Sequence, residues 1–171
     1  DLHDAILALP GALLEAGVVV MGFSLSGNMS LKFAAEYGTA LPLRALVTVS
    51  APIDLAATSA NMLRPRNKLF NGKLLRDFCR ECLAPGAAVS AGERAAIRAA
   101  RNFVELDHHF IAPRNGYRDA HDYWENCQAL EFLPQIQRPC LLLHAQDDPI
   151  VPIQPYLDYN FLQEAFDRER L

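Results

Sequence analysis

A serine in a turn of small residues is the first feature of this sequence that could do chemistry. Residues 22–28 read GFSLSGN and directly follow the apolar run VVVM. A nucleophilic serine between a strand and a helix needs small residues two places before and after it, so that the two elements can pass closely. Gly22 and Ser26 hold those places around Ser24, although the usual pattern, G-x-S-x-G, ends in glycine. We expect Ser24 to be a nucleophile in a strained backbone, and the main-chain N–H of Leu25 to donate to an oxyanion.

Two other interpretations of this turn are a tight packing turn and a nucleotide-binding turn. The second is disfavoured because the G-x-G-x-x-G fingerprint of dinucleotide binding is absent. The helix expected after the serine favours the nucleophile, since the free N–H groups of its first turn stabilise negative charge.

A second candidate group lies in HAQDDPIVP, residues 144–152. An acid at the end of a parallel strand, followed by proline and apolar residues, suits the carboxylate that orients the histidine of a Ser-His-acid triad. Asp148 is the predicted acid, Asp147 is the alternative, and either could simply cap a loop. The serine precedes the acid in the chain, as it does in hydrolases that carry the serine on a strand-to-helix turn.

No histidine follows the predicted acid, so the position of a triad histidine stays open. We expect His144 to be a packing or hydrogen-bonding residue. His108 and His109 are neighbours and should point apart, which is poor geometry for a shared metal. We expect no metal and no cofactor. The five histidines are His3, His108, His109, His121 and His144.

Two further groups have both a structural and a functional interpretation. Cys79 and Cys82 form a C-x-x-C pair in a helical stretch, where thiols on one helix face are the expected role, because no second close pair completes a zinc ribbon. An aromatic group near the end of the polar segment 107–130 either packs that segment or forms a wall for an acyl chain. Its members are Tyr117, Tyr123 and Trp124.

The elements that must position these residues follow the order helix, strand, helix, strand, which is typical of a parallel α/β sheet. VVVM should be covered on both faces, and Gly38 should end the helix after Ser24 in a left-handed conformation. We expect no strand from Ser50 to Pro139, and a capping box, S-x-x-E, at Ser90. The predicted helices are 2–16, 28–37, 67–83, a helix opened by Ser90 through 106, and the tail from 155; the predicted strands are 18–21, 44–50 and 140–144.

Length and composition predict one globular domain of 171 residues with a net charge of −4. No basic stripe suggests nucleic acid as a partner, and no apolar run reaches the length of a membrane span. No signal peptide is recognisable. We therefore expect a soluble, cytoplasmic protein, although an anchor preceding Asp1 stays open.

The chain resembles the YheT-like branch of the α/β-hydrolases, a group of esterases and phospholipases. The resemblance rests on GFSLSGN, VTVSAPIDL, PRNGYRDAHDYW and LLLHAQDDPIVP, in this order over nearly the whole chain. It implies Ser24 as nucleophile, Asp148 as acid, the Leu25 N–H in the oxyanion hole, no metal, and an acyl ester or lipid as substrate. An acyltransferase on the same fold and a non-catalytic remnant are the alternatives.

The resemblance also implies that the chain is an internal piece of a longer hydrolase. The fold class is then a partial α/β-hydrolase fold over residues 1–171, a parallel sheet flanked by helices with a helical cap at about 55–130. Its N-terminal strands and its C-terminal histidine segment would lie outside this sequence. We expect the isolated chain to be inactive and to self-associate through VVVM, left as an apolar strand edge.

Overall fold

The computed structural model describes residues 2–161, which form two compact units. The sheet unit, formed by residues 2–54 and 128–161 of the described chain, contains its three strands. The helical unit consists of residues 55–127. The predicted absence of strands between Ser50 and Pro139 is confirmed. The helical tail predicted from 155 begins within α10 (Gln154–Asp158) but is interrupted at Tyr159, whose backbone is extended, and the tail beyond 161 lies outside the described residues.

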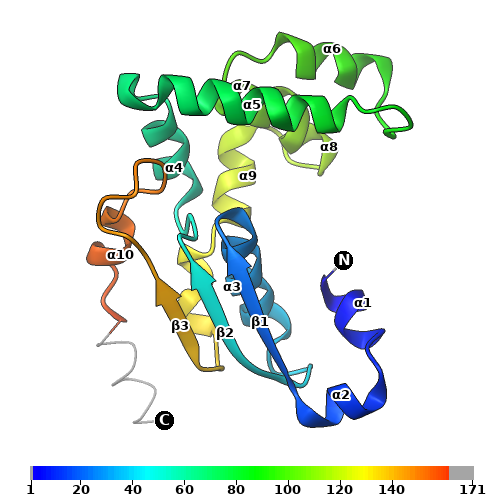
Figure 1. Cartoon of the computed structure of the whole chain (residues 1–171), viewed down its shortest axis with the longest axis vertical. Helices are drawn as coiled ribbons and strands as arrows, with labels where there is room; N and C mark the ends of the chain where they lie inside the picture. Colours follow the sequence, from blue (N-terminus) through cyan, green and yellow to red (C-terminus); the bar gives the residue numbers. More distant parts are fainter. Residues whose placement is uncertain (1, 162–171) are drawn as a thin grey trace. The chain divides into compact units, whose positions relative to one another are not determined.

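Figure 1 follows the elements of both units in chain order. The sheet unit contains α1 (Leu2–Leu7), α2 (Gly11–Ala16), β1 (Val18–Phe23), α3 (Leu25–Tyr37), β2 (Leu43–Val49), the 3-10 helix η3 (Leu130–Gln135), β3 (Cys140–Leu143) and α10 (Gln154–Asp158). The helical unit contains α4 (Leu55–Met62), the 3-10 helix η1 (Pro65–Asn67), α5 (Lys68–Cys82), α6 (Ala91–Ala99), α7 (Phe103–Leu106), the π-helix η2 (Asp107–Ile111), α8 (Ala112–Arg114) and α9 (Ala120–Cys127).

The sheet is parallel, with the strand order β1-β2-β3. Phe23 pairs with Val49, which in turn pairs with Leu143, so the three strands end in one row. The carboxyl ends of all three strands therefore open onto the same edge of the sheet. This is the edge at which parallel α/β sheets bind ligands.

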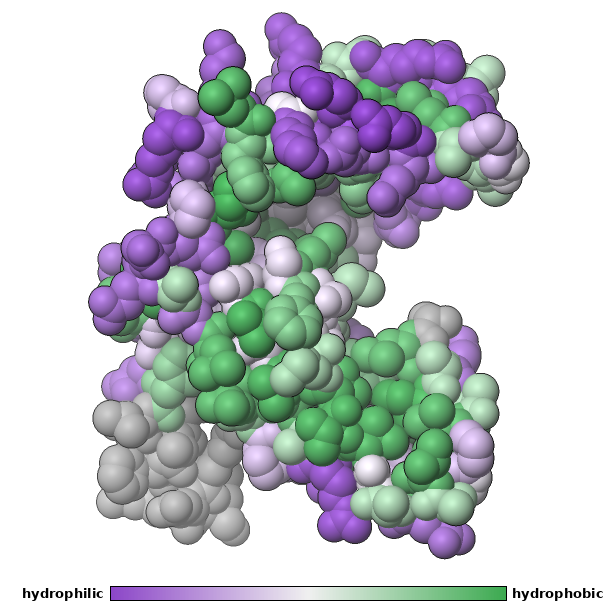
Figure 2. All heavy atoms as spheres, in the orientation of Figure 1, coloured by the Kyte–Doolittle hydropathy of each residue, from purple (hydrophilic) through white to green (hydrophobic). Residues whose placement is uncertain are grey.

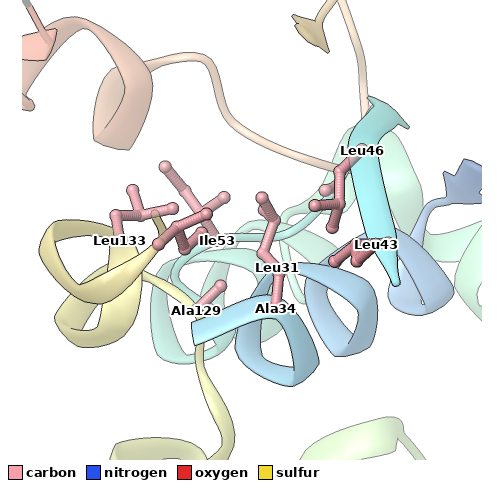
Figure 3. Packing of buried hydrophobic residues seen from close by; sticks show 9 residues of the cluster. Leu31, Ala34, Leu43, Leu46, Ile53, Ala129 and Leu133 are labelled. Carbon is pink, nitrogen blue, oxygen red and sulfur yellow. The ribbon is translucent and has the colours of Figure 1, made fainter. Parts of the chain in front are cut away.

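One face of the sheet packs against α3 and η3. Buried side chains from the helix, from β2 and from the segments after β2 and α9 interlock in a single cluster, part of which is shown in Figure 3. The labelled members of this cluster are Leu31, Ala34, Leu43, Leu46, Ile53, Ala129 and Leu133. A smaller cluster of Ile6, Phe33 and Leu41 fixes α1 beside α3. Together these clusters give the serine turn a rigid support.

The opposite face of the sheet is open in the described chain, so the prediction that VVVM is covered on both faces was wrong. Met21 is 58% exposed, and Val19 and Phe23 are as open, while Val20 beneath them faces the core. Leu141 and Leu143 continue the open face on β3. Figure 2 looks onto this face, where hydrophobic side chains gather over the strands. The apolar, β-branched run correctly predicted a strand, but whether the faces of that strand are covered depends on elements distant in the sequence.

The helical unit has a core of its own. Leu75 of α5, Ile97 of α6, Leu106 of α7 and Phe110 of η2 form one buried cluster. Ser90 caps α6 through the predicted box: its hydroxyl accepts from the N–H of Glu93, whose carboxylate accepts from the N–H of Ser90. None of the helices described here is both long and apolar enough to cross a membrane.

Four local predictions need correction. The helix predicted over 2–16 is broken into α1 and α2, because Pro10 lacks the N–H that a continuous helix requires. Gly38 is right-handed, and glycine is needed there because a Cβ would meet the oxygen of Ala34 at 2.3 Å. Residues 55–62, which are not among the predicted helices, form α4, and the helix opened by Ser90 ends at Ala99 before α7 begins.

Candidate active site

Ser24 lies at the point where β1 ends and α3 begins. Its backbone has φ 51° and ψ −129°, in a region that residues other than glycine rarely adopt. Its N–H donates to the oxygen of Val49, and its oxygen accepts from the N–H of Gly27 at 2.8 Å. The side chain is exposed and caps no N–H of the helix. The turn therefore presents a hydroxyl group at the open edge of the sheet at a cost in backbone strain.

Glycine is required on both sides of this turn by close packing. A Cβ on Gly22 would meet the oxygen of Ser26 at 2.6 Å, and a Cβ on Gly27 would meet the Cβ of Ala51 at 2.7 Å. Strand, helix and the chain after β2 thus approach more closely than any side chain would allow. Gly22 matches the expected small residue before the serine, and Gly27 provides the second close approach.

Ser26 occupies the place where glycine is usual, and its side chain is used within the turn. Its Oγ accepts from the N–H of Phe23 at 2.9 Å and donates to the oxygen of Phe23 at 2.7 Å. Both polar groups of the residue before Ser24 are therefore bound to the first turn of α3. The substitution of serine for glycine links the two arms of the turn.

Leu25, the predicted oxyanion donor, is the first residue of α3. The N–H groups of the first turn of a helix have no partner within the helix, and the positive end of the helix dipole lies at this point. The Leu25 N–H therefore has the position and the polarity to stabilise a developing oxyanion next to Ser24.

Asp148 lies in a tight turn that begins after β3. One carboxylate oxygen, Oδ1, accepts from the N–H of Ile150 at 2.9 Å and from the N–H of Val151 at 3.0 Å. The N–H of Asp148 donates to the oxygen of Ala145 at 3.3 Å. Asp148 is half-buried, whereas the alternative acid Asp147 is exposed. Of the two, only Asp148 has its carboxylate oriented by described main-chain groups.

His144 supports the Asp148 turn from beneath. Its Nε2 donates to the oxygen of Val151 at 3.1 Å, and its ring stacks on Tyr156 at a centroid distance of 4.6 Å. The Tyr156 hydroxyl donates to the oxygen of Ala51 at 2.7 Å, and burial raises the pKa of this phenol to about 12. Nδ1 of His144 is buried and has no hydrogen-bond partner within residues 2–161. His144 is therefore a packing and hydrogen-bonding residue in this fold.

The register of the sheet brings the two candidate groups to one edge. Ser24 follows Phe23 directly, and the loop that carries Asp148 begins after Leu143, in the same row of the sheet. β2 lies between them, and its last residue, Val49, accepts from Ser24. The structure therefore places the predicted serine and the predicted acid at the same edge of the sheet, on loops that follow the two strands flanking β2.

The remaining candidates lie in the helical unit. His108 and His109 do not point apart as predicted: the π-helix places their rings edge to face at 4.7 Å. Residues 2–161 contain no group of three or more potential ligands that could hold a metal ion. Cys79 and Cys82 are free and half-buried, and burial raises the pKa of both thiols.

The predicted aromatic group packs within the helical unit. The rings of Tyr117 and Tyr123 are 5.7 Å apart, and the Trp124 Nε1 donates to Asp107 Oδ2 at 2.8 Å. Burial is the main reason that the pKa of Asp107 is raised, to about 6, and that of Tyr123, to about 12. The sequence did not predict a special role for Asp107, because no local pattern indicates that its carboxyl group is buried.

Sequence reasoning also missed two residues of the sheet unit. Asn28 is only 2% exposed, and its Oδ1 accepts from the N–H of Ala129 at 2.7 Å, which ties α3 to a segment 101 residues away. Ser50 directly follows β2 and has φ 49°, so each of two adjacent strands is followed by a strained serine. No local pattern in the sequence indicates the bond of Asn28 to a segment this distant.

A parallel α/β sheet with a strained serine between strand and helix is the arrangement of an α/β-hydrolase. Relatives of the chain agree. It is 34% identical over 143 residues to the candidate esterase YheT of Escherichia coli, and the matched segment covers 82% of this chain and 42% of that protein. It is 26% identical over 140 residues to a monoacylglycerol lipase of Saccharomyces cerevisiae, covering 77% of this chain and 31% of the lipase. The chain is a homologue of the YheT-like branch of the α/β-hydrolases.

The chain spans less than half the length of these relatives. Among solved structures, the esterase domain of a Rhodothermus marinus protein aligns with 92% of this chain and 49% of its own, at 23% identity and a TM-score of 0.46. No family model matches the sequence.

Proposed function

We propose that the complete protein is a serine esterase that cleaves acyl esters with Ser24 as the nucleophile. The observation that carries the proposal is the backbone of Ser24, whose φ of 51° holds an exposed hydroxyl between β1 and α3. Strain of this kind concentrates at functional sites. Relatives named as an esterase and as a monoacylglycerol lipase support ester hydrolysis and an ester or lipid substrate.

The proposed reaction begins with attack of Ser24 Oγ on the ester carbonyl carbon. The carbonyl oxygen becomes an oxyanion, which the Leu25 N–H stabilises at the start of α3. The triad histidine takes the proton of the Ser24 hydroxyl and passes it to the departing alcohol, which leaves an acyl group on Ser24, and water then releases the acid in a second step. A helical cap at residues 55–127 would select the acyl chain.

Asp148 is the proposed acid of the triad. Two main-chain N–H groups bind its Oδ1, which leaves Oδ2 to receive the Nδ1–H of a histidine and stabilise its charged form. His144 is unsuited to be that histidine because its Nε2 is bonded to Val151 and its ring is stacked on Tyr156. The relatives are more than twice as long as their matched segments, so we propose that a histidine outside this sequence completes the triad.

The test uses the complete protein, with this chain in its natural flanking sequence. Ser24→Ala should abolish labelling by a fluorophosphonate probe and lower ester hydrolysis by about 10⁴–10⁶-fold. Ser26→Ala and Ser50→Ala are the matched controls, since both remove a hydroxyl nearby and should retain labelling. Equal labelling of the Ser24→Ala variant would sink the proposal.

A second pair of variants separates the two candidate acids. Asp148→Asn should lower kcat by about 10⁴-fold, because a triad histidine then lacks the anion that orients it. The asparagine oxygen can still accept from Ile150 and Val151, so the turn should persist. Asp147→Asn should leave kcat nearly unchanged, and the reverse result would move the role to Asp147.

A further inference from the structure

The α5 surface, which we define as the exposed side chains of residues 63–76, combines positive charge with apolar groups. The sequence from 55 to 76 contains no acid. Five exposed cations lie within the α5 surface: Arg64, Arg66, Lys68, Lys73 and Arg76. Four exposed apolar residues lie among them: Leu63, Leu69, Phe70 and Leu74. In Figure 2, α5 is largely covered by hydrophilic side chains, with hydrophobic groups standing among them.

The apolar residues of this surface do not contribute to the core of the helical unit. Asn71 and Leu75 form the buried side of α5. Leu69 is 90% exposed and shares the opposite side with Lys73, four residues further on. Because burial is what stabilises a fold, a leucine this exposed adds almost nothing to folding. Its exposure suggests that something outside the described chain covers it.

The cations are placed against the helix dipole. Arg66 and Lys68 lie at the N-terminal end of α5, where the dipole is positive, and the first turn contains no acid. This arrangement lowers helix stability, since acids are the residues that stabilise this end. It also concentrates positive potential at one end of the helix, next to Leu69 and Phe70.

Buried asparagines hold this end of the helix in place. The Asn67 Nδ2 donates to the oxygen of Asn61 at 2.9 Å, and the Asn71 Nδ2 donates to the oxygen of Met62 at 3.2 Å. These bonds join the end of α4 to the start of α5. The exposed side chains are therefore presented on a fixed backbone and need no folding step before binding.

We infer that the α5 surface docks on an anionic lipid surface. The cations would bind lipid phosphates while Leu69 and Phe70 enter the boundary between headgroups and acyl chains, as amphipathic helices do at membrane interfaces. A single protruding leucine inserts easily between lipids, whereas a protein partner would need a pocket shaped for it. The inference does not depend on the role of Ser24.

Charge across the sequence agrees with a docking site confined to this unit. Residues 55–127 contain eleven Lys and Arg against eight Asp and Glu, whereas the rest of the chain contains five against twelve. Attraction to an anionic surface is therefore limited to the helical unit, and the sheet unit is repelled. The net charge of −4 conceals this asymmetry.

Co-sedimentation of the intact chain with vesicles tests the inference. We expect binding to vesicles of phosphatidylcholine with phosphatidylglycerol, weaker binding to phosphatidylcholine alone, and loss of the difference at high salt. Arg64→Gln with Lys68→Gln should weaken partitioning onto the anionic vesicles about 30-fold, whereas Lys73 is left in place because it is paired with Asp77 at 2.7 Å. Leu69→Ser should weaken it about ten-fold. These side chains are exposed, so the variants should fold.

Two control variants match these changes. Arg101→Gln removes one cation from the same unit, but its guanidinium is already paired with Glu105 at 2.6 Å, so it should change partitioning little. Leu157→Ser removes an exposed leucine of the sheet unit, and it too should have little effect. Unchanged partitioning of the Arg64 and Lys68 double variant would overturn the inference. So would failure to bind anionic vesicles accompanied by binding to polyglutamate, which would indicate an acidic protein partner.

Discussion

The sheet unit and the helical unit both expose hydrophobic side chains, but in different surroundings. On the open sheet face, Met21, Val47 and Leu141 form one row and Phe23, Val49 and Leu143 form the next, with no charged residue in either row. On α5, the exposed apolar residues alternate with lysines and arginines. A purely apolar face is stable only when it is covered, whereas a mixed face is stable in water and can also dock.

The largest effect should come from charging the open sheet face. We expect the isolated chain to self-associate through this face and the β1 edge. Met21→Lys with Leu141→Lys should weaken association at least about a thousand-fold, because burial would lose apolar area and would have to desolvate two cations. Sedimentation equilibrium measures this, with Leu69→Lys as the control on α5. If Leu69→Lys dissociates the complexes and the double variant does not, the open sheet face is not the surface through which the chain self-associates.

The difference between the open sheet face and α5 also shows which features of the fold can be predicted from the sequence. The strands were recognisable because apolar, β-branched runs are a local signal. Whether a face is covered depends on distant elements, so the open side of β1 could not be read from VVVM. The break in the helix predicted over 2–16 has a local cause, because Pro10 has no N–H to donate. Glycine at position 38 is required by the close approach of the Ala34 oxygen and not by a left-handed backbone.

A second comparison involves one carboxyl group in each unit. Asp148 of the sheet unit receives two main-chain N–H groups. Asp107 of the helical unit is mostly buried and receives only the Trp124 indole as a described donor, and burial raises its pKa to about 6. One acid is held in position by hydrogen bonds, whereas the other is held by packing at an electrostatic cost.

Stability of the helical unit should therefore fall as pH rises. The pKa of Asp107 is 3.8 when unfolded and about 6 when folded, so the folded state binds more protons between these values. The free energy of unfolding should decrease from about pH 4 to about pH 6, by up to about 3 kcal/mol, and then level off. Urea unfolding across this range measures the change.

Asp107→Asn keeps an oxygen to accept from Trp124 and removes the charge. The variant should lose this pH dependence and be more stable than the parent above pH 6. Asp77→Asn is the control: the hydrogen bond from Lys73 lowers the pKa of Asp77 from 3.8, so its contribution changes only below about pH 4 and the fall from pH 4 to pH 6 should persist in this variant. A parent whose stability rises from pH 4 to pH 6, with a variant that follows it, would contradict the prediction.

The candidate site was more predictable than the fold around it. Ser24 and Asp148 could be selected because small residues near a serine and an acid after a strand are local patterns. The bond between Asn28 and Ala129 spans 101 residues, so no local pattern indicates it. The strain at Ser50 was missed because nothing in VTVSAP requires a positive φ.

The smallest effect should come from Ser26, which tests whether the departure from G-x-S-x-G is structural. Ser26→Ala removes two hydrogen bonds to Phe23 but gains helix propensity, so unfolding should become easier by about 1 kcal/mol. Ser26→Gly should cost about 1 kcal/mol more because glycine is a poor helix former. Urea unfolding measures both, and ester hydrolysis by the complete protein should stay within a few-fold, because Gly27 and not Ser26 provides the close approach to Ala51. If Ser26→Ala leaves stability unchanged and abolishes hydrolysis, the hydroxyl of Ser26 takes part in the chemistry and the two arms of the turn are held by other contacts.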